Sequence, residues 1–209
     1  EWVLYEPNLG YYAANRQKIG AGGDFVTSPH LGADFGELLA EQVLDLWLSL
    51  ERPNPFQIVE MGAGQGLIAA DVLRYLCSLT RQSHPSDYAA FWEALEYIIV
   101  EKPPAFIEEQ QKVLKPFVET DRKLTWRTWE EISDESIVGC FFSNELVDAF
   151  PVHRIESQAG QLQEVYVATS ESDPTQFVEV VSSPSTPELQ SYLDALGVSL
   201  TSYEDGYRS

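Results

Sequence analysis

The stretch "QIVEMGAGQGLIAADVLRYL", residues Gln57–Leu76, decides the fold of this chain. It opens with an apolar run typical of a buried strand, which ends in an acid, Glu60. Three glycines spaced two residues apart come next: Gly62, Gly64 and Gly66. Glycine lacks a Cβ and adopts positive φ at little cost, so a ligand can approach such a turn closely. Apolar residues then recur at helical spacing, and the stretch predicts a strand, a ligand-binding turn and a helix.

The glycine spacing narrows the class of ligand. A dinucleotide-binding turn follows G-x-G-x-x-G, but Leu67 occupies the position of its third glycine. A phosphate-binding P-loop ends in G-K-[S/T], which this stretch lacks. S-adenosylmethionine remains, and E-x-G-x-G-x-G resembles the first motif of the class I methyltransferases that use it. This cofactor carries a sulfonium and an ammonium group, so Glu60 is suited to hold the amino group directly or through water.

A second acid, Glu101, closes the next strand-like run, "EYIIVEK". A carboxylate at this place can accept hydrogen bonds from both ribose hydroxyls of a nucleoside. Glu101 lies 101 − 60 = 41 residues after Glu60, about twice the ~20 expected in a compact unit. A helix inserted at Ser86–Ala94 accounts for the excess. The alternative is that the glycines form a packing turn and that Glu101 is an exposed acid.

Strands and helices alternate along most of the chain. A helix is expected from Asp34, where apolar residues recur three or four apart: Phe35, Leu38, Leu39, Val43, Leu46 and Leu50. Further strands are expected within "KLTWRTW" and at Ile137–Phe142, and a further helix after the prolines of "EKPPAF". This order predicts an α/β fold, a Rossmann-like, mostly parallel sheet with helices on both faces. From Val152, β-rich stretches with short turns predict added antiparallel strands.

Length and composition fit one main globular domain with appended elements. The chain has 209 residues, of which 44% are hydrophobic, enough to bury a core. We expect an N-terminal segment and helix covering the cofactor at 1–55, a cofactor-binding core at 56–155, and added strands with a helix, a substrate or cap region, at 156–209. No apolar run reaches the ~18 residues of a membrane span. The first residues show neither a basic nor an apolar leader, so no signal peptide is expected.

The charge restricts the class of partner. The chain contains 13 Lys and Arg residues and 33 Asp and Glu residues, which gives a formal net charge of −20. This negative charge would be repelled by phosphate backbones, so nucleic acid is disfavoured as a partner. The acidity serves either solubility or the docking of a protein with a basic segment. Cys77 and Cys140 are expected to be buried thiols in a reducing compartment, and the scattered histidines predict no metal site. We therefore expect a bacterial-type cytoplasm or, alternatively, the mitochondrial matrix.

Five blocks resemble one methyltransferase family in order and approximate spacing: "YEPNLGYY", "GDFVTSPHLGADFGELLAEQ", "VEMGAGQGLIAADVLRYL", "YIIVEKPPAFIEEQQKVL" and "SNELVDAFPVHRI". The family is that of the mitochondrial complex I assembly-factor protein arginine methyltransferase and its bacterial relatives. The resemblance covers most of Leu4 to Ile155. It implies a class I fold that uses S-adenosylmethionine, and its characterised mitochondrial member dimethylates an arginine of a complex I subunit.

The resemblance also implies roles for individual residues. Glu60 and the three glycines match the family's cofactor loop, and Glu101 matches its ribose acid. An N-terminal "GDF-TSP" block, which closes over the cofactor in the family, is matched by Gly23, Asp24, Phe25, Thr27, Ser28 and Pro29. The block after the fourth strand is matched by Asn144, Glu145 and Asp148.

This chain departs from the family pattern at several places. His30 stands where Glu is usual, Gln65 where a basic residue is frequent, and Lys102 where Ser is frequent. Family members also continue past "SYEDGYRS" to a later Asp-Tyr-Gly block, which is absent here. We therefore expect the C-terminal part of the fold to be missing, which would leave the fourth strand as an exposed edge.

Asn144 and Glu145 follow an apolar run, so they are expected to face the cofactor from the carboxyl end of the fourth strand. A carboxylate at Glu145 or Asp148 can pair with a guanidinium through two parallel hydrogen bonds. The alternative is that Asn144 caps a helix and the acids are solvated. Trp126 and Trp129 suit either a substrate wall or, as is more common for aromatic residues at this spacing, packing in the core, and the sequence does not decide between the two.

The leading hypothesis is an S-adenosylmethionine-dependent methyltransferase that acts on arginine in a protein partner. A rival hypothesis is an assembly or scaffolding protein that keeps the fold and acts by docking a partner. A third is a methyltransferase for nitrogen or oxygen atoms of small molecules.

Overall fold

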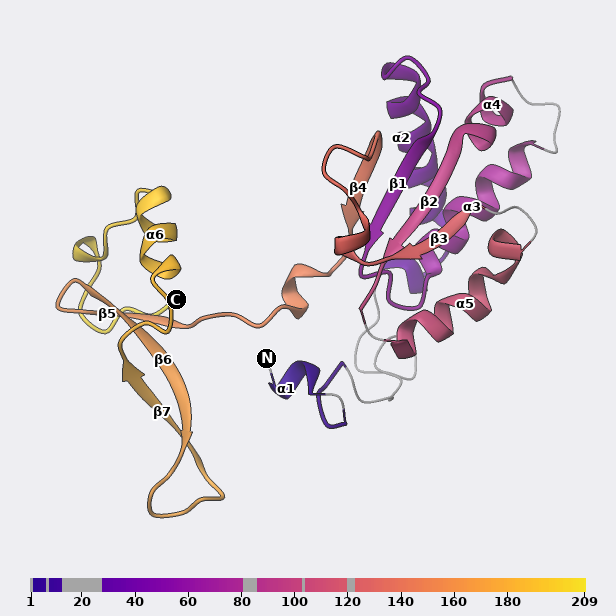
Figure 1. Ribbon diagram of the computed structural model, residues 1–209. Coiled ribbons are helices and arrows are strands. Elements are labelled where there is room, and N and C mark those ends of the chain that lie inside the picture. Colours follow the sequence, from indigo (N-terminus) through magenta and orange to yellow (C-terminus); the bar gives the residue numbers. More distant parts are fainter. Residues whose placement is uncertain (1, 7, 13–27, 81–85, 103, 120–122) are drawn as a thin grey trace. The chain divides into compact units, whose positions relative to one another are not determined.

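A computed structural model describes residues 2–6, 8–12, 28–80, 86–102, 104–119 and 123–209. The chain divides into two compact units, Glu1–Phe150 and Pro151–Ser209. Figure 1 shows the two units and the elements of each.

The first unit is built on a parallel sheet. Its strands are β1 (Phe56–Met61), β2 (Leu95–Val100), β3 (Leu124–Arg127) and β4 (Gly139–Ser143), in the order β3-β2-β1-β4. The expected parallel α/β fold is therefore confirmed. Because all four strands run in one direction, their carboxyl ends meet at a single edge, where ligands bind in such sheets.

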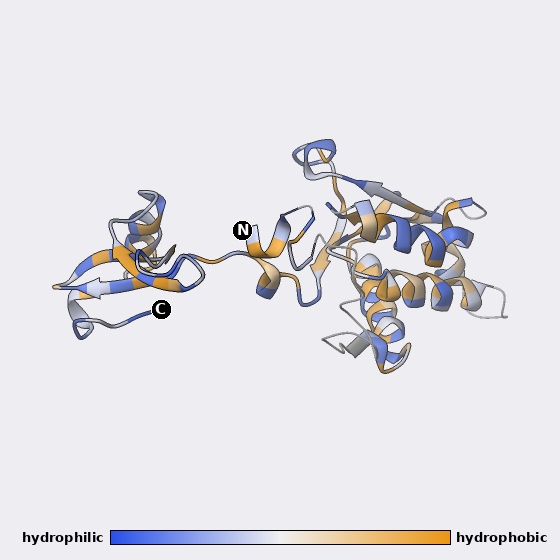
Figure 2. Ribbon diagram, turned by 90° about the horizontal axis from the view of Figure 1, so that it is seen from below, coloured by the Kyte–Doolittle hydropathy of each residue, from blue (hydrophilic) through white to orange (hydrophobic). Residues whose placement is uncertain are grey.

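Four helices cover this sheet: α2 (Asp34–Ser49), α3 (Leu67–Thr80), α4 (Ser86–Ala94) and α5 (Pro104–Glu119). Helices were expected on both faces of the sheet, but α2 to α5 pack into one apolar core on one face (Figure 2). Across the sheet, Val59, Ile98 and Val100 are covered by Ile132 and Ile137. The reason is that the described part of the β3–β4 connection forms only a 3-10 turn, Trp129–Glu131, in place of a helix.

Helix α2 buries only part of the apolar series that marked it in the sequence. Val43 is buried, but Phe35 and Leu38 are exposed, and Gly36 and Ala40 are buried instead. A Cβ built on Gly36 would meet the Cβ of Asp71 on α3 at 2.6 Å. Small side chains on this face therefore let the backbones of α2 and α3 approach each other closely, which the larger apolar residues would prevent.

The second unit contains a separate antiparallel sheet, which the three strands expected after Val152 form by themselves. These strands are β5 (Ile155–Gln158), β6 (Gln161–Thr169) and β7 (Phe177–Ser182), in the order β5-β6-β7. Helix α6 (Glu188–Ala195) and a 3-10 turn, Leu200–Ser202, follow. Three apolar residues of this unit are buried: Leu162, Val165 and Leu200.

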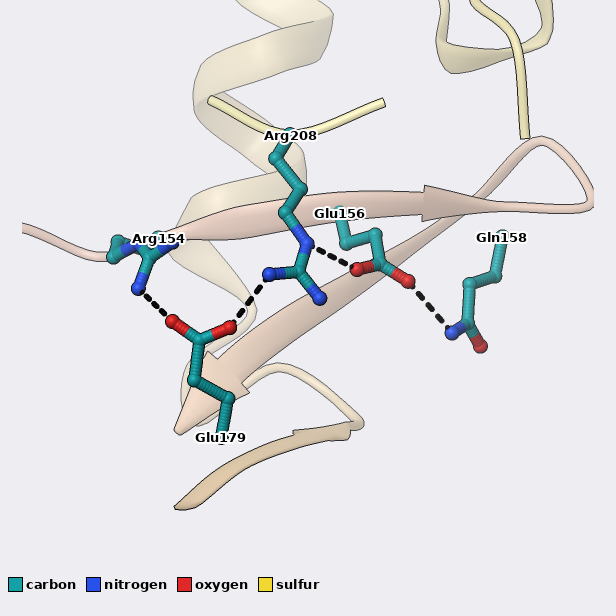
Figure 3. A network of polar contacts seen from close by, with 5 residues as sticks. All are labelled: Arg154, Glu156, Gln158, Glu179 and Arg208. Carbon is teal, nitrogen blue, oxygen red and sulfur yellow. Dashed lines mark hydrogen bonds and ion pairs between the residues drawn. The ribbon is translucent and has the colours of Figure 1, made fainter. Parts of the chain in front are cut away.

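A network of ion pairs joins the C-terminal end of the chain to this small sheet (Figure 3). The guanidinium of Arg208 donates to Glu156 on β5 and to Glu179 on β7, each at 2.6 Å. Arg154 donates to the other carboxylate oxygen of Glu179 at 2.5 Å. Donation from Gln158 and from Arg208 lowers the pKa of Glu156, whose side chain is largely buried. The network therefore ties three segments of the chain together while neutralising two carboxylates.

Among the helices of the described ranges, none combines the length and the apolar character needed to cross a membrane. Within the same ranges, no group of three or more His, Cys, Asp and Glu residues could hold a metal ion.

Candidate functional site

The turn between β1 and α3 adopts the conformation that its glycines predict. Gly62, Gly64 and Gly66 have φ values of +65°, +54° and +76°, in the left-handed region that favours glycine. Leucine side chains also approach two of them closely. A Cβ on Gly62 would lie 2.6 Å from Leu146, and one on Gly66 would lie 3.1 Å from Leu114, so a side chain at either position would require its neighbour to shift. The backbone conformation is therefore the main reason for glycine in this turn.

This turn forms one wall of a cavity of about 130 Å³ at the carboxyl edge of the sheet. The wall consists of Glu60 and residues from the turn and the start of α3: Gly62, Ala63, Gly64, Gln65, Leu67 and Ile68. The other wall comes from the segment after β4 and from the N-terminal region: Asn144, Glu145, Asp148, Ala149, Tyr12, Pro29 and His30. The cavity therefore joins the predicted cofactor turn to the predicted acceptor residues.

Glu60 is the acid at the end of β1, and only 2% of it is exposed. The hydroxyl of Tyr97, on β2, donates to its Oε2 at 2.8 Å. Burial raises the pKa of Glu60 to about 7, against the lowering effect of the Tyr97 hydroxyl and with a further rise from the charge of Glu101. A buried carboxyl with such a pKa carries a proton about half of the time near neutral pH, and a cation in the cavity would favour its ionised form.

Glu101 follows β2 directly and lies beside the glycine turn. The parallel register pairs Met61 with Val100, and the N–H of Gly62 donates to the Val100 carbonyl at 3.0 Å. The Glu101 carboxylate accepts the Lys102 N–H at 3.1 Å and the Gln110 amide at 3.0 Å. Burial raises its pKa, and these hydrogen bonds oppose the rise. Glu101 is outside the cavity wall itself, one strand along the same edge.

The residues after β4 face the same cavity. Asn144 and Glu145 follow β4 directly, and Asp148 lies in the 3-10 turn Val147–Ala149. The N-cap of that turn is Leu146, so Asn144 does not cap it, contrary to one part of the alternative weighed from the sequence. Glu145 and Asp148 are both exposed, as the other part of that alternative expects. Glu145 has a φ of +50°, a left-handed conformation that costs a residue with a Cβ about 1 kcal/mol or more. Such strain is frequent at functional sites.

Only part of the N-terminal block can be placed. Gly23, Asp24, Phe25 and Thr27 lie outside the described residues, and Ser28 begins the 3-10 turn Ser28–His30. The rest of that turn, Pro29 and His30, lines the cavity. The ring of His30 is hydrogen-bonded to the side-chain oxygen of Gln65 at 3.1 Å. His30 and Gln65, two positions at which this chain departs from the family pattern, therefore contact each other in the lining of the cavity.

The N-terminal segment adds a wall residue that the sequence analysis did not select. Tyr12 lines the cavity, and its ring stacks on that of Tyr5. The Tyr5 hydroxyl donates to the Ala149 carbonyl at 2.6 Å, which fixes this segment beside the residues after β4. Burial raises the pKa of Tyr12, as does the nearby charge of Asp148. In the sequence, the aromatic block "YEPNLGYY" was the feature that could have indicated Tyr12 as a site residue.

Two buried partners were also missed: Tyr97, which binds Glu60, and Gln110, which binds Glu101. Gln110 interrupts an apolar series at four-residue spacing between Phe106 and Leu114 on α5. A polar residue in such a series is a signal that sequence analysis can use. Trp126, expected to pack in the core or line a substrate wall, donates its indole N–H to Gln110 at 2.8 Å.

Known proteins resemble the chain over most of its length. Residues 38–209 match the model of a family described as "Putative S-adenosyl-L-methionine-dependent methyltransferase". The chain is 32% identical, over 88% of its length and 44% of the relative's, to a Drosophila melanogaster protein named "Protein arginine methyltransferase NDUFAF7 homolog, mitochondrial". A Xenopus tropicalis protein named for the same activity is 28% identical over 79% of the chain and 40% of its own length.

Solved structures give the same result. A COG1565 superfamily member from Burkholderia thailandensis, bound to S-adenosyl-homocysteine, matches with a TM-score of 0.71 and 27% identity. The match covers 99% of this chain and 48% of that one. The chain thus spans less than half the length of these relatives. The sequence match, the parallel α/β fold and the glycine turn agree, and the chain belongs to this family of S-adenosylmethionine-dependent methyltransferases.

Proposed function

We propose that this chain transfers a methyl group from S-adenosylmethionine to an arginine side chain of a protein partner. The observation that carries the proposal is the cavity in which the glycine turn faces Asn144, Glu145 and Asp148. A methyl donor held at the turn and an acceptor held at these three side chains would share one cavity.

The residues of the turn fit the cofactor. The glycine turn lines the cavity, where its bare backbone would let the methionine portion approach closely, and the buried carboxyl of Glu60 would hold the amino group. Glu101, one strand along the same edge, is placed to accept hydrogen bonds from the ribose hydroxyls. Pro29, from the described part of the N-terminal block, and His30, which follows it, also line the cavity.

The residues after β4 suit a guanidinium acceptor. When bound, the cofactor supplies an electrophilic methyl group on its sulfonium. Two carboxylates, Glu145 and Asp148, can pair with a guanidinium and draw its positive charge away from the nitrogen that accepts the methyl group. Apolar wall residues such as Leu67 and Ile68 help to exclude water, and positioning in line with the methyl carbon contributes more than strong base catalysis.

The charge of the chain and its relatives support a protein partner. A net charge of −20 favours a partner with a basic segment. The curated relatives from Drosophila melanogaster and Xenopus tropicalis are named protein arginine methyltransferases. Their names also contain the word mitochondrial, which favours the second of the two compartments expected from the sequence.

Transfer of labelled methyl groups from S-adenosylmethionine to a basic Arg-containing peptide, with a Lys-containing peptide as comparison, tests this proposal. Glu145→Gln and Asp148→Asn should each lower kcat/KM for the Arg peptide about ten- to a hundredfold. This is the loss expected when one charge-assisted hydrogen bond to the acceptor is removed. Their affinity for S-adenosyl-homocysteine should change little. Glu119→Gln, the same kind of change at an exposed position of α5, should leave all of these quantities unaltered.

Other outcomes would contradict the proposal in distinguishable ways. Transfer to small amines or alcohols but to neither peptide would favour the small-molecule methyltransferase. Cofactor binding without transfer to any acceptor would favour the assembly or scaffolding protein.

A further inference from the structure

Gln110 is a polar residue with no solvent exposure, and its amide contacts both halves of the proposed cofactor site. Its Nε2 donates to the carbonyl of Gly64 in the glycine turn at 2.8 Å and to Oε2 of Glu101 at 3.0 Å. Its Oε1 accepts the indole N–H of Trp126 on β3 at 2.8 Å. A primary amide has two N–H donors and one carbonyl oxygen, so each of these groups has a partner.

The three partners determine how the amide is turned. The indole N–H of Trp126 can only donate, so it must meet the amide oxygen. The Gly64 carbonyl and an ionised Glu101 can only accept, so they must meet the amide nitrogen. The opposite orientation would place two acceptors against the oxygen and two donors against each other. Trp126 therefore fixes the orientation in which Gln110 donates toward the site.

Close packing of α5 against the turn makes this contact possible. A Cβ on Gly66 would approach Cγ of Gln110 to 3.3 Å and Leu114 to 3.1 Å. The third glycine thus gives α5 the space to bring the amide between the turn and the end of β2. Donation from Gln110 also opposes the effect of burial on the pKa of Glu101 and so favours its ionised form.

We propose that Gln110 is a positioning residue for cofactor recognition, which holds the Glu101 carboxylate and the Gly64 backbone at a fixed separation so that ribose and methionine portions are bound together. The proposal rests on the roles proposed above for Glu101 and the glycine turn. Gln110 itself acts through these two groups, since it lines no part of the cavity wall.

The test compares the binding of S-adenosyl-homocysteine and its 2′-deoxyribose analogue by calorimetry. The unaltered protein should bind the ribose form about tenfold or more tightly than the deoxy form. A hydrogen bond to a charged group contributes a factor of about this size to the affinity. Gln110→Met keeps the length and volume of the side chain but removes the amide. It should weaken binding of the ribose form and reduce the preference for ribose to about threefold or less.

Two further variants separate positioning from a general loss of structure. Gln111→Met makes the same chemical change at the next, exposed residue of α5 and should keep both the affinity and the preference. Trp126→Phe removes the indole N–H that orients the amide, together with part of the ring, and it should give an intermediate preference. Thermal melts establish that each variant is folded, and Trp126→Phe carries the test if Gln110→Met unfolds.

Each result decides a different question. If Gln110→Met and Trp126→Phe weaken the binding of both ligands equally and keep the preference for ribose, Gln110 contributes only to stability and the inference is wrong. If the unaltered protein binds S-adenosyl-homocysteine without preferring ribose, the role proposed for Glu101 fails, and the inference fails with it. Absence of binding by the unaltered protein would overturn the cofactor site as a whole.

Discussion

Replacing Glu60 with glutamine tests how strongly burial controls the charge at the base of the site. Glu60 is buried at the end of β1, where its pKa is raised from 4.5 to about 7. Between these two values the folded protein binds a proton that the unfolded chain has released. The free energy of unfolding therefore falls as pH rises through this window, because ionising the buried carboxyl costs energy in the folded state only.

The size of the effect follows from the pKa difference. The shift of 7 − 4.5 = 2.5 pH units corresponds to about 3 kcal/mol at 1.36 kcal/mol per unit. The sequence pI of 4.3 argues against measurements below pH 5, where the protein approaches zero net charge. From pH 5 to pH 8, Glu60→Gln should gain about 2–3 kcal/mol of stability relative to the unaltered protein. The introduced amide stays neutral throughout and still offers an acceptor to the Tyr97 hydroxyl.

Urea unfolding of both proteins at several pH values measures this difference, and groups that titrate in both proteins cancel from it. The cofactor gives a second readout, because an ammonium group beside Glu60 favours its ionised form. Binding of S-adenosyl-homocysteine near pH 7 should release up to about half a proton, seen by calorimetry in buffers of different ionisation enthalpy. Parallel stability curves for the two proteins from pH 5 to pH 8 would refute the reasoning.

Two further predictions concern stability. Gly36→Ala should destabilise the first unit by about 1–3 kcal/mol in urea unfolding, although alanine is the better helix former, because its Cβ would meet Asp71 at 2.6 Å. Gly32→Ala, where a Cβ meets nothing within 4 Å, should change little, and equal effects would contradict the packing argument. Arg208→Gln should lower the thermal midpoint at pH 7, because it leaves the buried Glu156 without its cation. The pKa of Glu156 is lowered, so this acid is ionised in the unaltered protein from pH 5 to pH 8 and the loss should persist throughout that range. An unchanged thermal midpoint would show that the ion pair is not responsible.

Local pattern in the sequence was sufficient for the elements that build the site. The strand, glycine turn and helix of Gln57–Leu76 are present as expected, with β1 at Phe56–Met61 and α3 from Leu67. Asn144 and Glu145 were expected to face the site because they follow a strand, and both line the cavity. They lie together because parallel strands bring their carboxyl ends to one edge, whichever residues separate them along the chain.

Predictions that depended on a neighbouring element were less complete. The apolar series that marked α2 includes Phe35 and Leu38, which are exposed, while Gly36 and Ala40 are buried. Helical spacing identifies a helix, but the face that it buries depends on how closely the next helix approaches. Tyr97 and Gln110 were missed for a related reason, since their partners lie 37 and 46 residues away in the chain, at Glu60 and Gly64.

The sequence by itself determined the class of fold, the glycine turn and the candidate residues at two strand ends, because each depends on local backbone preference and short-range periodicity. Only the tertiary structure decided that helices α2 to α5 share one face of the sheet. It also decided that Glu60 is buried against Tyr97 and that one amide joins Gly64 to Glu101. Burial and hydrogen-bond partners arise from segments distant in the chain, and these set the charge and the geometry of the site.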